Sequence, residues 1–333
     1  MFPLNFKIYF TKKLDKTVYI PYISICTVYT RFFVREKRDI MLRLEHVNKR
    51  ISSFELKDIH FHLPKGYICG LIGENGAGKT SLIKTIIGLY RMDTGACMVN
   101  ESEFTTQEAE VKEQLGLILD SCMFEKYLSL ELVGKYYGPF YQSYDHKLFM
   151  QYLKQFELNP KKKVKTLSKG MLIKLQLAFA LSHDAKLFIF DEPTSGMDEE
   201  FRKEFYQICA ELVSDGEHSV LVSTHITEDL DRIADYLAYM QDGELLFFDE
   251  KDQALDKFVI VTAENYKLKL LSKDYVIHTE ESTYGGTAMM IKQKYKKLDE
   301  AYRSKTPTIQ EFMYYMVKGG HSHAKNVIAK CFN

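Results

Sequence analysis

Eight residues, 73–80, carry the clearest chemistry in the sequence. They read GENGAGKT and fit the pattern G-x-x-x-x-G-K-[ST], with an apolar segment before them and a helix-forming segment after them. The glycines allow successive backbone N–H groups to curve around phosphate oxygens. Lys79 can reach the β- and γ-phosphates, and the Thr80 hydroxyl can ligate Mg²⁺. We therefore predict a nucleotide-binding phosphate loop that consists of Gly73, Glu74, Asn75, Gly76, Ala77, Gly78, Lys79, Thr80 and Ser81.

Two acids follow a fully apolar segment in LFIFDEP, residues 187–193. An acid at the carboxyl end of a parallel strand, beside a phosphate loop, is the usual magnesium partner, so we assign this role to Asp191. Glu192 is then suited to orient or deprotonate the water that attacks the γ-phosphate. The next apolar segment ends in His225, which we expect near the same phosphate. Without the phosphate loop upstream, DEP would indicate only an acidic turn before a proline.

A second candidate anion site follows at residues 165–183, which read KTLSKGMLIKLQLAFALSH. Ser168 and Gly170 stand at the start of an apolar, amphipathic helix, and a helix N-terminus with a hydroxyl favours anions. The question is why a chain with one phosphate loop carries a second such helix start.

The elements that must position these residues alternate between strands and helices, which predicts an α/β fold. We expect strands at residues 41–47, 54–63, 66–73, 95–101, 185–193 and 217–225, and a hairpin at 236–249 around Asp242 and Gly243. Helices are expected at 80–90 and over most of 108–158, with a break at Gly138 and Pro139. Beyond residue 251 we expect short strands at 257–263, 267–271, 275–279 and 288–294. A closing helix at 308–319 follows, and His321 and His323 are expected in a frayed tail.

The composition narrows the possible classes. Lys and Arg number 45, as do Asp and Glu, so nothing indicates a nucleic-acid partner. Six scattered cysteines form no C-x-x-C pair, which argues against zinc and disulfide frameworks. The sequence has no apolar run of about 18 residues, so we expect no spanning helix.

The ordered set GENGAGKT, LSKGM, LFIFDEPTSGMD and STH resembles the ATP-binding subunit of an ABC transporter, over roughly residues 41–250. The segments at 54–80 and 167–171 look most like exporter ATPases of the antibiotic-resistance or peptide-immunity kind. The resemblance implies an ABC-type P-loop NTPase core with an antiparallel β subdomain, a helical subdomain at about 121–180 and a small C-terminal α+β extension at 251–333. We expect residues 1–40 to be disordered or untranslated.

The resemblance also implies an activity and partners. The subunit would hydrolyse ATP with Mg²⁺ and power transport, in the direction of export, through a separate membrane permease at the cytoplasmic face of the membrane. Two ATPase chains, identical or different, would pair head to tail. Ser168, Lys169, Gly170 and Met171 would then bind the ATP that the partner chain holds, which answers the question above. Ser195 and Asp198 would lie in the loop that links the two sites.

Three departures from the family pattern concern the site. Lys169 and Met171 replace the usual Gly and Gln. Asp120 stands where a Gln is usual, and its carboxylate could contact Mg²⁺ or its waters. Ile51 occupies the position of the adenine-stacking aromatic, and nearby Phe54 either stacks on adenine or belongs to the core.

Two further points stay open. Aromatic residues between 124 and 141 either line a groove for a permease helix or pack the helical subdomain. The rival functions are a soluble ABC-type ATPase that acts on ribosomes or DNA, and a small-molecule kinase. The lack of a tandem second ATPase domain argues against a function on ribosomes or DNA. LSKGM together with STH argues against a small-molecule kinase.

Overall fold

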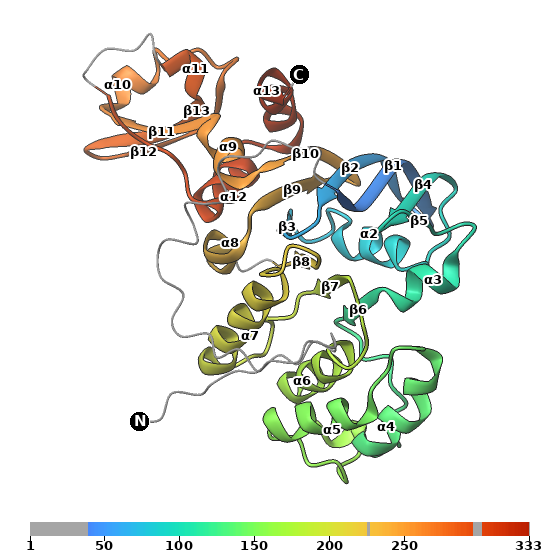
Figure 1. Ribbon diagram of the computed structural model, residues 1–333. Coiled ribbons are helices and arrows are strands. Elements are labelled where there is room, and N and C mark those ends of the chain that lie inside the picture. Colours follow the sequence, from blue (N-terminus) through green and yellow to red (C-terminus); the bar gives the residue numbers. More distant parts are fainter. Residues whose placement is uncertain (1–38, 225–226, 296–301, 333) are drawn as a thin grey trace.

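The structure, a computed structural model, describes residues 39–224, 227–295 and 302–332. The predictions for residues 1–38 and for His225 therefore lie outside the described residues. Within them, ten strands form one sheet (Figure 1). In sheet order these strands are β5 (Ser102–Glu103), β4 (Thr94–Val99), β1 (Ile40–Ile51), β2 (Phe54–Pro64), β10 (Glu244–Glu250), β9 (Tyr236–Gln241), β3 (Ile68–Ile72), β8 (Ser219–Ser223), β7 (Leu187–Asp191) and β6 (Leu115–Ile118).

The two ends of this sheet have different characters. Strands β9, β3, β8, β7 and β6 run parallel, and every residue of β3, β7, β8 and β9 is buried. Such burial on both faces explains why these segments are almost continuously apolar. Strands β1, β2, β4 and β5 pair antiparallel, and β2 alternates partly between buried and exposed residues. The strands predicted before residue 251 and the hairpin of β9 and β10 are present in this sheet.

One core strand was missed in the sequence. Residues 108–158 were expected to be mostly helical, but β6 interrupts them and pairs with β7 from Leu115↔Leu187 to Ile118↔Phe190. A segment of four residues is too short to show a period, and its strand conformation depends on its neighbour in the sheet. Gly116 permits the pairing at close range, because a Cβ there would lie 2.5 Å from the Phe188 ring. Strand β6 leads directly to Asp120.

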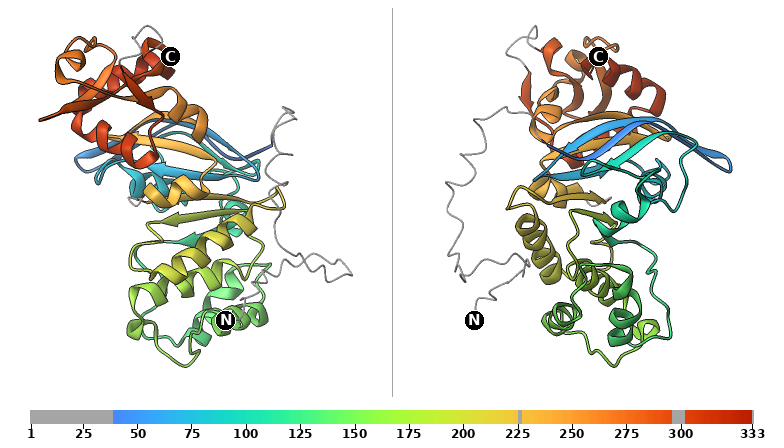
Figure 2. Two further views of the ribbon diagram at one scale, coloured as in Figure 1. Left: turned by 90° about the vertical axis from the view of Figure 1, so that its left-hand side faces the viewer. Right: turned by 45° about the vertical axis from the view of Figure 1, so that its right-hand side comes forward.

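Helices surround the parallel strands and form a separate layer at one end of the molecule (Figures 1 and 2). The helices near the sheet are α2 (Lys79–Ile86), α3 (Glu108–Glu113), α6 (Lys169–Ala180), α7 (Glu199–Leu212) and α8 (Thr227–Ile233). The distant end holds α4 (Leu130–Tyr137) and α5 (His146–Gln155), capped by Ser129 and Asp145. The break expected at Gly138 is present as a short 3₁₀ turn, Gly138–Phe140.

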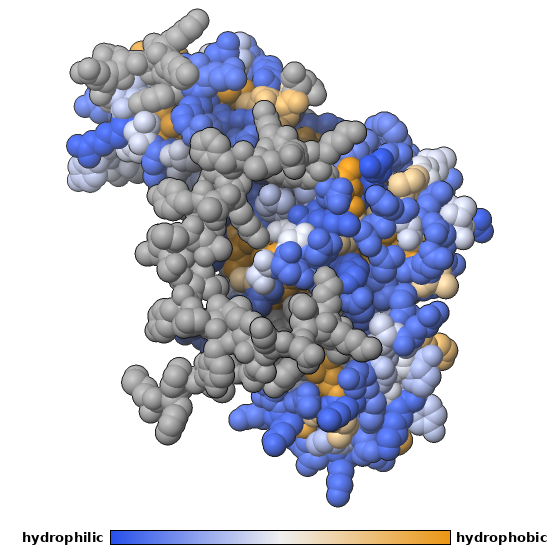
Figure 3. Space-filling view, in the orientation of Figure 1, coloured by the Kyte–Doolittle hydropathy of each residue, from blue (hydrophilic) through white to orange (hydrophobic). Residues whose placement is uncertain are grey.

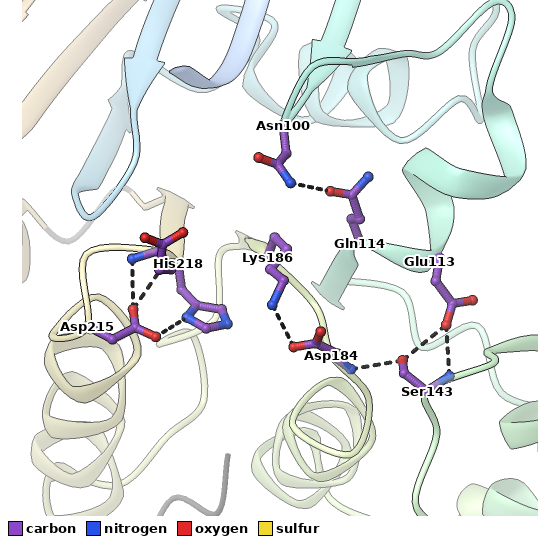
Figure 4. Close-up of polar contacts among 9 residues, drawn as sticks. Asn100, Glu113, Gln114, Ser143, Asp184, Lys186, Asp215 and His218 are labelled. Atoms are coloured by element: carbon purple, nitrogen blue, oxygen red, sulfur yellow. Dashed lines mark hydrogen bonds and ion pairs between the residues drawn. The ribbon is translucent and has the colours of Figure 1, made fainter. Parts of the chain in front are cut away.

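A chain of polar contacts ties this helical end to the sheet (Figure 4). The Ser143 backbone N–H and hydroxyl both donate to Glu113 at 3.0 Å, and the Asp184 N–H donates to the Ser143 hydroxyl. Asp184 in turn accepts from Lys186, next to β7. These bonds link the loop before α5 with the end of α3 and with the segment between α6 and β7.

The C-terminal part forms a second, four-stranded sheet in the order β12 (Val276–Ser282), β13 (Gly285–Ile291), β11 (Phe258–Ala263) and β14 (Arg303–Lys305). Its helices are α9 (Lys251–Asp256), α10 (Asn265–Leu268), α11 (Lys292–Tyr295), α12 (Ile309–Lys318) and α13 (His321–Phe332). This part lies at the end opposite α4 and α5 (Figure 2). Phe258 and Phe312 join the same apolar cluster as Tyr239 of β9.

Two predictions for this part were wrong. The strand expected at 267–271 is replaced by α10, whose Leu268 and the following Leu271 pack on β13 and β12. His321 and His323 do not lie in a frayed tail, because they belong to α13, which buries Ala324, Val327 and Ile328. Tertiary packing decides both cases, since neither segment is long or strongly patterned on its own. No described helix is long and apolar enough to cross a membrane.

Candidate functional site

The phosphate loop connects β3 to α2, as the sequence predicts. Lys79 is buried, and its ammonium donates to the carbonyl oxygens of Gly73 at 2.8 Å and Glu74 at 3.1 Å. Gly78 has φ 109°, and a Cβ there would lie 2.7 Å from the Phe54 ring. The loop therefore needs a glycine at this position for both its conformation and its packing. The Lys79 ammonium is held inside the curve where phosphate oxygens would bind.

Two of the three proposed magnesium ligands, Thr80 and Asp191, meet beside the loop. The Thr80 hydroxyl donates to Asp191 Oδ1 at 3.2 Å, and the Ser223 hydroxyl donates to the same oxygen at 2.6 Å. Mg²⁺ prefers hard oxygen ligands, and it commonly takes one or two from the protein and the rest from phosphates and water. Thr80 and Asp191 fit that requirement. No group of three or more His, Cys, Asp or Glu within the described part of the chain could hold a metal by itself.

Glu192 has an unusual backbone at the end of β7. Its φ is 50°, in the left-handed region that a non-glycine residue rarely adopts. Its N–H points back to β8, where it donates to the Ser223 carbonyl at 3.0 Å and to the Ser223 hydroxyl at 3.2 Å. Such a turn directs the Glu192 side chain away from the strand, and this side chain lines the pocket described below. Strain of this kind is often found at functional sites.

Electrostatics link these groups. Burial lowers the pKa of Lys79, while the carboxylates of Glu192 and Asp191 act to raise it. The two acids are thus close enough to Lys79 to stabilise its charge. A buried cation near two carboxylates, bonded to a phosphate loop, is suited to receive a polyphosphate with its metal.

A pocket of about 470 Å³ brings together part of the predicted site. It is lined by Phe54, Asn75, Gly76, Gly78, Lys79, Thr80, Ser81, Asp120, Glu192 and Ser195. Phosphate loop, proposed water-orienting acid and the Asp120 loop therefore meet in one cavity. Phe54 lies against Gly78 and is only partly buried, which leaves its ring available at the rim.

The second helix start, called the signature segment here (residues 168–171), is not among the residues that line this pocket. Ser168 caps α6 by accepting from the Met171 N–H at 3.3 Å, and Ser168 and Lys169 are exposed. A serine hydroxyl that accepts at the cap can still donate its own proton to a ligand. The segment packs on the predicted dimer loop, since a Cβ on Gly170 would lie 3.2 Å from the Gly196 carbonyl. Asp198 of that loop caps α7 through the Phe201 N–H.

Lys169 has partners that the sequence did not indicate. Its ammonium lies 2.8 Å from Asp120 Oδ1 and donates to the Ser195 hydroxyl at 3.2 Å. Asp120, considered in the sequence as a metal contact, therefore forms an ion pair with the signature segment of the same chain. This pair joins the phosphate pocket to the helix start that faces outwards.

Two positioning residues were missed. Ser223 contacts both Asp191 and Glu192. It is the serine of the STH motif, and its place in that motif was the only signal in the sequence. Gln176 is buried in α6 and exchanges two hydrogen bonds of 3.1 Å with the backbone of Leu119, next to Asp120. A lone amide within the apolar segment LIKLQLAFA is the signal that could have found it, because buried polar groups need partners.

The fold and the site together define a phosphate-loop nucleotide hydrolase with an ABC-type arrangement. The family model described as ABC transporter matches residues 56–195. A putative ABC transporter ATP-binding protein of Mycoplasma pneumoniae is 31% identical over 245 residues, which cover 70% of this chain and 72% of that protein. The chain belongs to the ABC transporter family, as an ATP-binding and ATP-hydrolysing subunit.

Other relatives differ in what their names describe. The lantibiotic transport ATP-binding protein SrtF of Streptococcus pyogenes is 27% identical over 64% of this chain and 92% of its own length. The galactose/methyl galactoside import protein MglA of Treponema denticola is also 27% identical, over 62% of this chain and 44% of its own.

Solved structures agree with the fold. An ATP-binding subunit of an ABC transporter matches with a TM-score of 0.59 and 25% identity, over 64% of this chain and 91% of that one. A dimeric ATP-binding cassette with bound ADP and phosphate matches with a TM-score of 0.57 and 19% identity, over 63% and 98%.

Proposed function

We propose that this chain powers export through a separate membrane permease, as a peripheral ATPase on the cytoplasmic face of the membrane. The observation that carries the proposal is the separate placement of two anion-binding features. The phosphate loop and Glu192 line one pocket, with Asp191 bonded to Thr80 beside it, while the signature segment lies outside that pocket with Ser168 and Lys169 exposed.

In the proposed reaction, the backbone N–H groups of residues 73–80 and the Lys79 ammonium hold the β- and γ-phosphates. Thr80 and Asp191 would hold Mg²⁺, which when bound would neutralise negative charge on the phosphates. Glu192 accepts a proton from the attacking water. The water oxygen bonds to the γ-phosphorus, and the bond between the γ-phosphorus and the ADP oxygen breaks. His225, outside the described residues, remains a proposed partner of the γ-phosphate, and Phe54 a proposed adenine contact.

The second half of each site would come from another ATPase chain. Ser168 and the backbone of Gly170 would donate to the γ-phosphate of ATP bound to the partner. Ser195 and Asp198 would lie where the two chains meet. A dimeric, post-hydrolysis cassette exists among the similar folds, and this precedent supports the pairing proposed here.

The proposed contact with the permease lies on the helical end. Of the aromatic residues noted in the sequence, Phe124, Tyr137 and Tyr141 pack against buried residues, which explains them as core. Tyr136 and Phe140, by contrast, are 63% and 80% exposed. Over the face shown in Figure 3 the surface is mainly hydrophilic, with apolar residues in small separate groups. Aromatic side chains are enriched at protein–protein interfaces, so we propose Tyr136 and Phe140 as the contacts with the permease.

Co-purification tests this proposal. The tagged chain is recovered from detergent-solubilised membranes, and a multi-span membrane protein is expected in the eluate. Phe140→Asp should release that protein while ATP binding is retained. Tyr284→Asp is the matched control, since Tyr284 is 97% exposed but lies in the C-terminal part. Recovery of ribosomal or DNA-bound partners instead, with no membrane protein, would contradict the transporter assignment.

Direction needs its own measurement. The purified complex is reconstituted in vesicles, and ATP is supplied only on the side where the ATPase faces. Export predicts that substrate leaves the ATP-containing compartment. Accumulation on the ATP side would instead indicate import, as the name of MglA describes for that protein.

A further inference from the structure

The C-terminal part reaches the phosphate loop directly. His321, the first residue of α13, places Nε2 at 2.8 Å from Glu74 Oε2 and Nδ1 at 2.8 Å from Asp242 Oδ2. Glu74 is the second residue of the phosphate loop, and Asp242 lies in the turn between β9 and β10. One imidazole from the end of the chain thus bridges two carboxylates around the nucleotide site.

The two bridged segments are themselves joined. The Gly243 N–H donates to the Ala77 carbonyl at 3.0 Å, so the turn after β9 is bonded to the middle of the phosphate loop. The Glu74 carbonyl accepts from the Lys79 ammonium. Glu74 therefore contacts His321 through its side chain and Lys79, the proposed phosphate-binding cation, through its carbonyl oxygen.

Helix α13 is held firmly enough to transmit this contact. The Phe332 ring stacks on Phe247 of β10 with centroids 4.5 Å apart, and His323 bonds to the Val276 carbonyl of β12 at 2.7 Å. Lys325 forms an ion pair with Glu244 of β10. The helix is thus anchored to both sheets, and His321 is presented from a fixed base.

The charges around His321 come from every neighbouring segment. Glu74 faces it from the phosphate loop and Asp242 from the turn. Glu244 on β10 is shared between Lys325 of α13 and Lys57 of β2. Burial is the main cause of the raised pKa of Tyr239 on β9, and the charges of Glu74 and Asp242 raise it further. The site therefore has an excess of negative charge that an imidazolium balances.

We infer that His321 is a positioning residue for ATP binding, whose charged imidazolium clamps Glu74 and Asp242 and so couples the C-terminal part to the phosphate loop. Two physical effects contribute. The imidazolium neutralises a carboxylate that neighbours the triphosphate site, and it fixes the loop to the turn that supports it. The inference rests on ATP binding at the phosphate loop.

The dependence on pH has a definite sign. The hydrogen bonds with Glu74 and then with Asp242 raise the pKa of His321 above its ordinary value. The clamp is therefore complete below the ordinary histidine pKa and is lost as pH rises through the raised value. By linkage, ATP binding should raise the pKa of His321 further, because each ligand strengthens the binding of the other.

The test compares Mg²⁺–ATP affinity of the full chain, the His321→Gln variant and the His321→Arg variant by titration calorimetry from about pH 6 to about pH 8.5. Exposed ion pairs are modest, so His321→Gln should weaken ATP binding about two- to fivefold at the low end and match wild type at the high end. His321→Arg should keep the higher affinity throughout, since arginine stays charged. Ratios between variants cancel the titration of ATP itself.

Asn326→Gln is the matched control, because Asn326 is exposed on the same helix and the change leaves the His321 and His323 contacts in place. Equal ATP affinity of wild type and His321→Gln at every pH would overturn the inference, as would an equal loss in Asn326→Gln. If His321→Gln unfolds, the His321 imidazole is followed by NMR in wild type, and an unchanged pKa on adding ATP overturns it instead. Failure of wild type to bind ATP would contradict the proposed function itself.

Discussion

The two proposed halves of the ATP site, the phosphate loop and the signature segment, are built in different ways. In the phosphate-loop half, Lys79 and Asp191 are buried, and Thr80, Ser223 and the Glu192 backbone form one hydrogen-bonded group. In the signature half, Ser168 and Lys169 are exposed, and Lys169 is paired with Asp120 of its own chain. The first half is thus buried and hydrogen-bonded within the chain, whereas the proposed second half is an exposed helix start.

This difference indicates how work can be coupled to ATP. A buried, preorganised half can bind nucleotide without rearrangement. In the proposed dimer, the surroundings of the exposed half would change when the second chain binds, so closure of the dimer is the step that we propose nucleotide controls. Variants in each half should therefore fail in different ways.

The largest effect is expected from the preorganised half. Glu192→Gln removes the proposed general base while it preserves the shape of the side chain, so ATP binding should remain and hydrolysis should slow by about a hundredfold or more. Steady-state phosphate release and ATP affinity measure the two quantities separately. Equal losses of affinity and turnover would show that Glu192 acts on the fold of the loop rather than on the attacking water.

A smaller and different effect is expected from the exposed half. Ser168→Arg fills the helix start, so the ATP-dependent dimer of the Glu192→Gln protein should disappear while each monomer still binds ATP within about twofold, because the substitution leaves the phosphate loop intact. Light scattering with ATP and Mg²⁺ follows the dimer. Lys79→Ala is the contrasting variant, since it should abolish both binding and pairing.

If the Glu192→Gln chain stays monomeric alone, the experiment is repeated with a second ATPase subunit or the permease present. Absence of ATP-promoted pairing in all of these settings would contradict the division of the site between two chains.

The sequence predicted the residues of the phosphate-loop half better than the contacts that join this half to distant segments of the chain. GENGAGKT, LFIFDEP and the hydrophobic strands are local patterns, and each specifies one element with its functional residue. Strand β6 and helix α13 are decided by distant neighbours, which a local pattern does not contain. The same holds for the Lys169 ion pair and for the contact of His321 with Glu74, where the partners are 49 and 247 residues apart.

Asp120 lies between the two halves, and its substitution should have an intermediate effect. Asp120→Ala removes a carboxylate from the pocket and releases Lys169, so we expect turnover to fall about three- to tenfold with ATP affinity within about twofold. The measurement is again phosphate release against ATP affinity. Normal turnover would leave Asp191 as the main protein carboxylate at the metal and reduce Asp120 to a loop residue.

The smallest effect concerns the Lys169–Asp120 pair itself. Both side chains are substantially exposed, and exposed ion pairs contribute about 0.2–1 kcal/mol, so thermal or denaturant stability should hardly change in Lys169→Ala. A double-mutant cycle with Asp120→Ala isolates the interaction in ATP turnover. If the pair couples the halves, the two single substitutions will not add, because either one breaks the same link. If Lys169 instead acts only on the partner's phosphate, its effect will be the same with and without Asp120. The cycle therefore distinguishes a Lys169 that is coupled to the pocket of its own chain from a Lys169 that acts only on the phosphate bound to the other chain.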